Sequence, residues 1–327
     1  MSLSYTMRLV CVVVMVAGLV LAASQLILAL SARFILRRID GASARRREQI
    51  LYLVQIGPAL AAAFVGVVLC LPAYLHSEPS RKIESVSLIC LLMTAGVGLW
   101  CAFAMLRGLR TVLRTLRFTR ACRRLGQALA EDGGLTVRSV PGANLPVALI
   151  GFLHPFIIVS VEFAGLADRL DPDALALALA HERAHAANRD NWKLLCVAFL
   201  PRVDRLLPGG RRWPELWRTA ADYAADDDAV QGDPARSMLL AEVLVLAARC
   251  AHGPRPATLC TALTHAEAGL AARIDRLTRP QCDASPSGAS ILHCLAALVL
   301  LAGAAFTFSP RIYVLSEWLL HLGAPWR

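Results

Sequence analysis

The sequence predicts a mainly α-helical, polytopic membrane protein with four transmembrane helices and a cytosolic α+β domain between the third and fourth spans. Two properties of the 327-residue chain lead to this fold class: 57% of its residues are hydrophobic and only 18% are charged. Soluble proteins average about 45–50% apolar and about 25% charged residues. The composition therefore excludes a disordered chain and an ordinary secreted protein.

Four apolar runs are long enough to cross the hydrocarbon core of a bilayer, which takes roughly 20 residues. They lie at about 9–30, 50–75, 86–106 and 291–308. The first three belong to an N-terminal membrane region, residues 1–106, and the fourth to a C-terminal segment, residues 290–327, that ends in a short tail. The first run exceeds the 7–15 apolar residues of a signal-peptide core, so we expect it to be retained.

Arginine clusters set the predicted orientation in the membrane. Six arginines lie between residues 33 and 47, after the first span, and seven lie between residues 107 and 124, after the third. The loop between the second and third spans holds two basic and two acidic residues. Positive loops stay in the cytoplasm, so we expect the N-terminus outside and residues 107–289 in the cytosol. The same argument favours a lipid bilayer as the partner of these arginines and no direct binding of nucleic acid.

Strands and then helices are predicted along the cytosolic domain. Stretches rich in valine and isoleucine predict strands at 135–140, 147–150 and 156–161. Asp171 followed by Pro172 has the form of an N-cap with proline in the first helical position, and predicts a helix to about Asn188. Later helices are expected from Trp213 through Asp226, over 235–250 and around 273–277.

The sharpest motif is His181-Glu182-Arg183-Ala184-His185, an HExxH sequence within the first predicted helix. Residues four apart share a helix face, so both imidazoles can reach one zinc ion. Glu182 can then act as the catalytic base toward a water whose pKa zinc lowers to about 7. A solvated helix face is the simpler interpretation. However, residues 174–180 are all alanine or leucine and predict a buried helix, which favours the metal site.

A catalytic zinc ion takes three protein ligands and keeps one open position. The following helix offers these candidates for the third ligand: Glu215, Asp222, Asp226, Asp227 and Asp228. Asp222 and Asp226 share a face and have small alanine neighbours, so one of them can bind zinc while the other orients a ligand histidine. We expect Asp227 and Asp228 to be solvated. Asp190 either orients a ligand histidine or caps a helix, and the sequence leaves both open.

These segments resemble the BlaR/MecR-type antirepressor metallopeptidases, which are integral-membrane gluzincins, and more distantly the HtpX and CAAX-prenyl peptidases. The matching stretches are HPFI at 154–157, HERAHAANRDN at 181–191, WRTAAD at 217–222, Ala225-Asp226 and Arg273-Ile274. The family's E-x-x-x-D pattern falls on Asp222 and Asp226. The resemblance thus implies one zinc ion bound by His181, His185 and Asp222, with Asp226 and Asp190 behind the ligands. Aspartate at 222 departs from the glutamate that is usual there.

The resemblance also implies a function: a zincin-like domain that acts as a zinc metalloendopeptidase at the inner membrane of a bacterium. The implied substrate is a protein or peptide, such as a cytosolic transcriptional repressor or the chain itself. We expect the strand at 156–161 to offer a sheet edge to an extended peptide. The family's sensors carry an extracellular penicillin-binding domain after the last span. Here that place holds residues 309–327, so direct β-lactam sensing is not expected.

Two alternatives stay open. The first is a quality-control protease like HtpX, which would cut misfolded membrane proteins. The second is a catalytically weak pseudoprotease that serves as a scaffold or signal relay, and the aspartate at position 222 keeps this alternative open.

Overall fold

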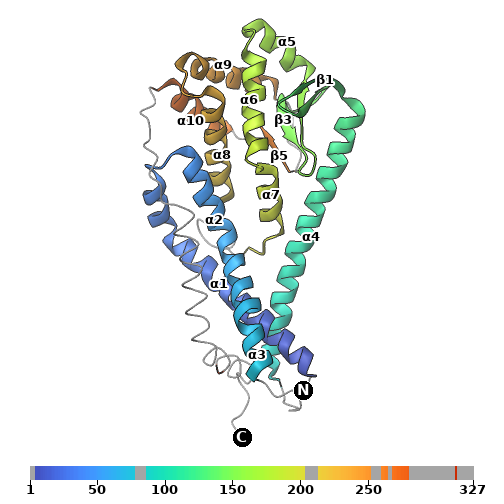
Figure 1. Cartoon of the computed structure of the whole chain (residues 1–327), viewed down its shortest axis with the longest axis vertical. Helices are drawn as coiled ribbons and strands as arrows, with labels where there is room; N and C mark the ends of the chain where they lie inside the picture. Colours follow the sequence, from blue (N-terminus) through green and yellow to red (C-terminus); the bar gives the residue numbers. More distant parts are fainter. Residues whose placement is uncertain are drawn as a thin grey trace.

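The computed structural model describes residues 4–77, 86–202, 213–251, 259–263, 267–279 and 314. Within these residues the protein is mainly helical, with one small mixed sheet (Figure 1). The predicted fourth span, at about 291–308, lies outside the described residues.

Three helical segments are long and apolar enough to cross a membrane. The first is α1 (Tyr5–Ile39), and the third is α4 (Leu88–Leu125). The second is α2 (Ala44–Ala63), continued by the π-helix η1 (Phe64–Cys70) and by α3 (Leu71–Ser77). All three carry large apolar side chains that are exposed, among them Leu26, Ile27, Leu30, Leu60, Val67, Leu92, Leu99 and Phe103. So much exposed apolar surface suits contact with lipid, and the first three predicted spans fall on these segments.

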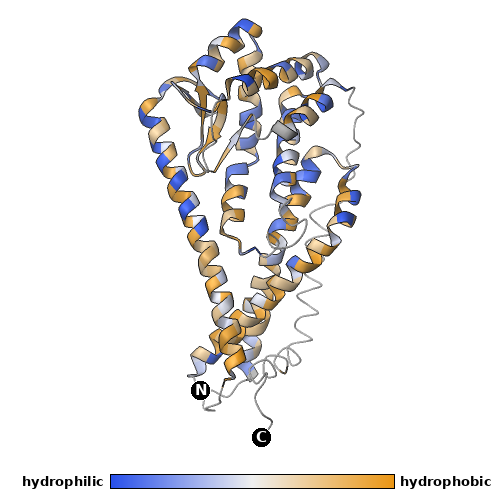
Figure 2. Cartoon of the chain, turned by 180° about the vertical axis from the view of Figure 1, so that it is seen from behind, coloured by the Kyte–Doolittle hydropathy of each residue, from blue (hydrophilic) through white to orange (hydrophobic). Residues whose placement is uncertain are grey.

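The three segments converge at one end of the molecule, drawn at the bottom of Figure 1. An apolar cluster joins them there, with Cys11, Val12, Met15, Cys70, Tyr74 and Cys90 at its centre. Gly18 of α1 leaves no room for a Cβ atom against Val97 of α4, so these two helices approach closely. Hydrophobic residues dominate this end, whereas polar residues appear toward the opposite end (Figure 2).

Helix α4 extends well beyond the apolar end. Its 38 residues span about 57 Å at a rise of 1.5 Å per residue, nearly twice the roughly 30 Å of a bilayer core. Its later part reaches the sheet and carries exposed arginines, namely Arg110, Arg114, Arg117, Arg120 and Arg124. The arginine-rich segment predicted to follow the third span is therefore a continuation of the same helix.

The sheet has five strands in the order β1-β2-β4-β3-β5. Strands β2 (Leu135–Val140) and β3 (Val147–Ile150) have the predicted bounds, and β4 (Phe156–Ser160) ends one residue early. The prediction that this third stretch forms a sheet edge is wrong, because β4 lies between β2, its parallel neighbour, and β3, its antiparallel neighbour. The flanking strands β1 (Gln127–Asp132) and β5 (Cys260–Ala262) were not predicted.

Six described helices make up the rest of this part of the chain. They are α5 (Val161–Leu170), α6 (Ala174–Ala187), α7 (Asp190–Phe199), α8 (Trp213–Val230), α9 (Pro234–Cys250) and α10 (Glu267–Thr278). Helix α5 was not predicted, and α6 begins two residues later than expected. The Asp171 carboxylate accepts a hydrogen bond from the Asp173 backbone N–H at 2.8 Å, which is the bond expected of the predicted cap. The regular helix nevertheless begins at Ala174, after one turn at Pro172 and Asp173, and not at Pro172.

Two apolar clusters place the helices that carry the HExxH motif and the acidic residues. One packs the sheet against α5, α6 and α9, with Leu149, Ile157, Phe163, Leu177, Ala178, Leu240 and Leu244 buried in it. The other joins α1 and α2 to α7 and α8 through Ile39, Leu51, Leu194, Leu195, Trp213 and Trp217. Helices α7 and α8 therefore lie against the membrane helices, between α2 and α4 (Figure 1).

Candidate metal centre

The HExxH motif lies on the last two turns of α6, where the helix is enclosed by β3 and α8. The side chains of His181, Glu182 and His185 have no exposed surface, and Asp222 of α8 is 5% exposed. Alanines at 220, 221, 224 and 225 are buried along α8, and such small side chains let two helices approach closely. The small neighbours noted in the sequence thus bring Asp222 to the histidines.

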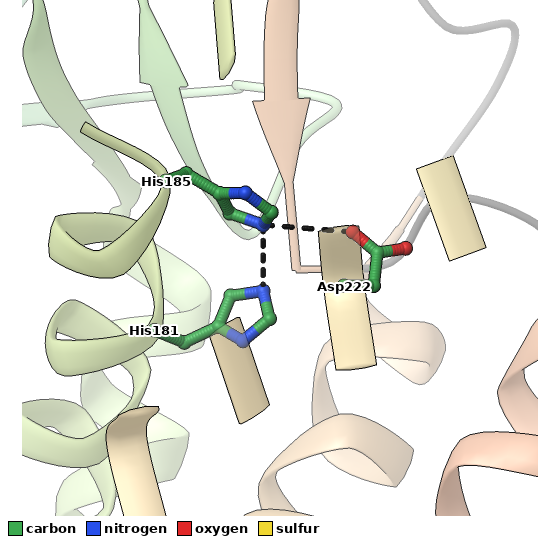
Figure 3. Close-up of side chains that lie close together, drawn as sticks. All are labelled: His181, His185 and Asp222. Atoms are coloured by element: carbon green, nitrogen blue, oxygen red, sulfur yellow. Dashed lines mark hydrogen bonds and ion pairs between the residues drawn. The ribbon is translucent and has the colours of Figure 1, made fainter. Parts of the chain in front are cut away.

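Three ligand atoms converge between the two helices (Figure 3). The Nε2 atoms of His181 and His185 lie 3.1 Å apart, and Asp222 Oδ1 lies 3.5 Å from His185 Nε2. One ligand atom from each of these residues lies within 4.8 Å of the other two. Two nitrogens bound to one tetrahedral zinc ion at 2.0–2.1 Å would stand about 3.3–3.4 Å apart. The observed spacing therefore fits two imidazoles that share one metal ion.

The opposite ring nitrogens explain why the two Nε2 atoms can face each other. His181 Nδ1 lies 2.9 Å from Asp226 Oδ1, and His185 Nδ1 lies 2.7 Å from Asp190 Oδ2. The His185 contact is a hydrogen bond, and a carboxylate oxygen can only accept one, so His185 Nδ1 carries a proton. His181 Nδ1 lies close to Asp226 but makes no well-directed hydrogen bond to it. Two Nε2 atoms at 3.1 Å repel each other if both present lone pairs, and a proton or a metal ion between them removes this repulsion. Carboxylates behind ligand histidines are the usual companions of a metal site.

Asp226 is fixed by Arg273 of α10. The guanidinium Nε and Nη2 atoms donate to Asp226 Oδ2 and Oδ1 at 2.9 and 2.6 Å, and Nη1 donates to the Leu263 carbonyl oxygen. Although burial alone would raise the pKa of Asp226, Arg273 and His181 hold it well below its usual range. Asp226 is therefore a permanent anion, aimed at His181.

Asp190 reaches His185 because the chain reverses sharply between α6 and α7. Arg189 adopts a left-handed conformation with φ of 54°, which non-glycine residues rarely adopt. The turn starts α7 at Asp190 and brings its carboxylate back to the helix that has just ended. Of the two roles that the sequence left open for Asp190, the structure shows the contact with the histidine.

Glu182 lies beside the cluster, and its two carboxylate oxygens differ in their hydrogen bonding. Oε2 accepts a hydrogen bond from the Leu149 backbone N–H of β3 at 3.0 Å. Among the described residues, the buried Oε1 atom has no hydrogen-bond partner. Burial raises the pKa of Glu182 to about 8. Its carboxylate is thus held in place while its proton affinity suits proton transfer near neutral pH.

The two histidines respond differently to their surroundings. Burial lowers the pKa of His181 to about 4, which keeps this imidazole neutral. Burial also disfavours charge on His185, but its hydrogen bonds to Asp190 and Asp222 raise its pKa to about 10. The centre therefore favours one positive charge near His185 Nε2, which either a proton or a bound metal ion would supply.

The other acidic candidates lie away from this centre. Asp227 pairs with Arg276 at 2.6 Å, and Asp228 pairs with Arg45 at 2.7 Å. Both aspartates are partly exposed, as expected, but each is bound to an arginine. Glu215 is exposed near the start of α8. Of the five carboxylates considered in the sequence, Asp222 and Asp226 are the pair that the fold places beside the histidines.

A cavity of about 300 Å³ lies next to His185, between the segment after β3 and the turn that joins α6 to α7. Phe152 and Trp192 line it and contact each other edge to face, with ring centroids 5.8 Å apart. On the other side of Glu182, β5 pairs with β3, and Thr261 Oγ1 lies 3.5 Å from Glu182 Oε2. This cavity therefore adjoins the centre on the His185 side, and β5 adjoins it at Glu182.

Sequence reasoning missed several residues that support the centre. Asn191 Nδ2 donates to the carbonyl oxygens of Leu149 and Gly151, at 3.2 and 2.7 Å, and so ties α7 to β3. Lys193 and Glu48 form a further chain of contacts, described below. Lys193 is one of two lysines in the chain, and Glu48 follows three arginines. Both were visible in the sequence, but nothing there brings them together.

The comparisons with known proteins leave the resemblance as a prediction. No protein-family model matches this chain. No curated protein matches it in sequence either.

Proposed function

We propose that this protein is a membrane-embedded zinc metalloendopeptidase that cuts peptide bonds on the cytosolic side of the membrane. One observation carries the proposal: two imidazoles and one carboxylate converge within 4.8 Å in a buried site, with Glu182 beside them. A buried polar cluster of this kind is costly unless its groups are satisfied, and a bound cation would satisfy them.

Zinc is the metal that suits this donor set best. Two neutral imidazoles and a carboxylate are a common ligand set of catalytic zinc, which leaves a fourth position for water or substrate. Calcium and magnesium prefer sites built from oxygen atoms, and His181 and His185 supply nitrogen. Copper also binds imidazole, so metal analysis of the purified protein is the direct test of this choice.

In the proposed reaction each residue has one task. A zinc ion bound by His181, His185 and Asp222 would polarise the scissile carbonyl and lower the pKa of a water. Glu182 Oε1 takes a proton during the attack and passes it to the departing amine, while Leu149 N–H holds the other oxygen still. Asp226 and Asp190 keep both imidazoles oriented, with each Nε2 lone pair directed inward.

The cavity beside His185 offers a protein substrate a route toward the centre. Its aromatic lining at Phe152 and Trp192 suits an apolar substrate side chain. We propose a cytosolic repressor, or another segment of this chain, as the physiological substrate, in line with the antirepressor peptidases that the sequence resembles.

The proposed topology has four spans, with the N-terminus outside and the metal centre in the cytosol. The arginines that follow the first and third spans support this orientation. A bacterial inner membrane is the proposed location. A fluorescent protein that folds only in the cytosol should stay dark when it is fused before Met1 and should fluoresce when it is inserted after Gly134. The opposite pattern would refute the topology.

The decisive experiment combines metal analysis with proteolysis. Purified protein and its Glu182→Gln variant should both contain about one equivalent of zinc, and only the parent should cut a protein substrate. Cleavage of casein at many sites would favour the quality-control alternative, whereas cleavage of one partner at one site would favour the regulatory role. Equal cutting by the Glu182→Gln variant would refute the assigned base.

The pseudoprotease alternative has one observation in its favour: an aspartate, one methylene shorter than the usual glutamate, supplies the third ligand. It predicts that the parent has no activity and that Asp222→Glu creates it. Activity in the parent would exclude it.

A further inference from the structure

A chain of charged contacts leads from the second membrane helix to the metal centre. Glu48, at the start of the second turn of α2 after Arg45, Arg46 and Arg47, is 1% exposed. Its Oε1 atom accepts a hydrogen bond from Lys193 Nζ of α7 at 2.8 Å. Lys193 Nζ also donates to Asp190 Oδ1 at 2.9 Å, and Asp190 Oδ2 lies 2.7 Å from His185 Nδ1. Glu48 and His185 are thus joined through two intervening residues.

Glu48 also contacts the helix that supplies the third ligand. Trp217 Nε1 of α8 donates to Glu48 Oε1 at 2.8 Å, five residues before Asp222. Tyr52, one turn after Glu48 on α2, lies next to both partners: its ring centroid is 6.3 Å from that of Trp217 and 6.0 Å from Lys193 Nζ. The first part of α2 therefore contacts both α7 and α8.

The burial of Glu48 needs an explanation. A buried ion pair is often no more stabilising than apolar residues of the same volume, and in some proteins such a pair instead fixes one conformation. A packing role alone would be served by an apolar side chain at position 48. A carboxylate at this place, however, sets the position of the Lys193 ammonium group that reaches Asp190.

We propose that Glu48 and Lys193 are positioning residues that couple the place of helix α2 in the membrane to the geometry of the metal centre. When Glu48 holds Lys193, the Asp190 carboxylate has one oxygen fixed by the ammonium group and the other directed at His185. A displacement of α2 withdraws Lys193, frees Asp190 to rotate, and loosens the orientation of His185. The proposal rests on the metal-binding part of the proposed function and does not depend on proteolysis.

A second ion pair between the same helices provides a matched control. Arg45 of α2 binds Asp228 of α8 at 2.7 Å, but both side chains are partly exposed and neither touches a residue of the metal centre. If the contacts of Glu48 only fasten α2 to the rest of the protein, loss of the Arg45 pair should have a similar effect on metal binding. If the contacts of Glu48 position the metal centre, their loss should weaken metal binding and loss of the Arg45 pair should not.

The test uses Co²⁺, whose visible absorption reports its ligands, with the full-length protein in detergent. Glu48→Gln and Lys193→Met should each weaken Co²⁺ binding by about tenfold, the lower end of the 10–100-fold range for groups behind metal ligands. Each should also change the Co²⁺ spectrum. The double variant should lose about tenfold as well, because both residues act through one contact chain. Lys193→Arg should keep the parent affinity, and Arg45→Gln should match the parent in affinity and spectrum.

Any one of three results would overturn the proposal. The first is a Co²⁺ affinity of Glu48→Gln equal to that of Arg45→Gln, and the second is a loss of affinity of about a hundredfold in the double variant. The third is a Co²⁺ spectrum that neither Glu48→Gln nor Lys193→Met changes. If Glu48→Gln fails to fold, the comparison of Lys193→Met with Lys193→Arg decides, since Lys193 is 20% exposed and tolerates change more readily. If Glu48→Gln and Lys193→Met weaken Co²⁺ binding as expected but neither the parent nor any variant cuts a protein, only the peptidase proposal is refuted. If the parent cuts a protein but these two variants bind Co²⁺ like the parent, only the role of Glu48 is refuted.

Discussion

Arg273 holds Asp226 through two hydrogen bonds of 2.9 and 2.6 Å, and both side chains are almost completely buried. Because Asp226 Oδ1 also lies 2.9 Å from His181 Nδ1, this pair supports one of the candidate metal ligands. Removal of one partner from a buried ion pair leaves the other uncompensated, which costs about 3–5 kcal/mol.

Arg273→Met should therefore lower the free energy of unfolding by about 3–5 kcal/mol and weaken metal binding. Denaturant titration in detergent, with and without zinc, measures both effects. The matched control is Arg276→Gln, which breaks the half-exposed pair with Asp227 on the same two helices and should cost about 0–1 kcal/mol. Equal losses in the two variants would contradict the role given to Asp226.

Zinc should stabilise the metal-free protein. A ligand at a hundred times its Kd adds about 2.7 kcal/mol to the stability of the folded state, which thermal unfolding registers as a rise in Tm. His185→Gln should abolish this rise. His154→Gln, which alters an exposed histidine outside the cluster, should keep it. A rise of the same size in the His185 variant would place the metal elsewhere.

The length of the side chain at position 222 should control metal affinity. Asp222→Ala should reduce Co²⁺ binding by at least a hundredfold, because one of three ligands is lost. Asp222→Glu should bind as well as the parent or better, since the longer side chain extends the carboxylate farther from α8 toward the histidines. Asp228→Ala, six residues further along α8, serves as the control with unchanged affinity. Normal Co²⁺ binding by the alanine variant would exclude Asp222 as a ligand.

Glu182→Gln should separate metal binding from catalysis. The amide keeps the size of the side chain and an oxygen that accepts from Leu149 N–H, but it cannot take a proton. We expect an unchanged zinc content and a fall in the rate of proteolysis of at least about 10²-fold, as is typical when a general base is lost. Glu162→Gln, at an exposed position on α5, should leave the rate unaltered.

Local sequence patterns predicted the strands and helices of the central part because each of these elements is specified by its own residues. The valine and isoleucine runs at 135–140 and 147–150 are strands with the expected bounds, and the second of them is completely buried. Strand β1 was missed because its sequence, Gln-Ala-Leu-Ala-Glu-Asp, favours a helix. It forms a strand by pairing with β2 across Gly133 and Gly134, which both have positive φ. That Gly-Gly pair was the overlooked indication of a hairpin.

Contacts between distant segments were beyond local patterns. Strand β5 has three residues and exists as a strand through its pairing with β3, so its sequence alone carries no such preference. The position of β4 in the middle of the sheet likewise follows from the strand order, which hydropathy does not encode. In the metal centre, a four-residue spacing was enough to suggest the two histidines and the Asp222–Asp226 pair. The contact between Glu48 and Lys193 joins residues 145 positions apart and required the fold.

The complete enclosure of His181, Glu182 and His185 has a kinetic consequence. An ion can enter or leave such a site only when the surrounding helices part briefly, and the free energy of local opening sets how often this happens. Exchange of the metal should therefore be slow and should accelerate with mild denaturant. Metal added to the folded protein should likewise bind slowly, at a rate set by this opening.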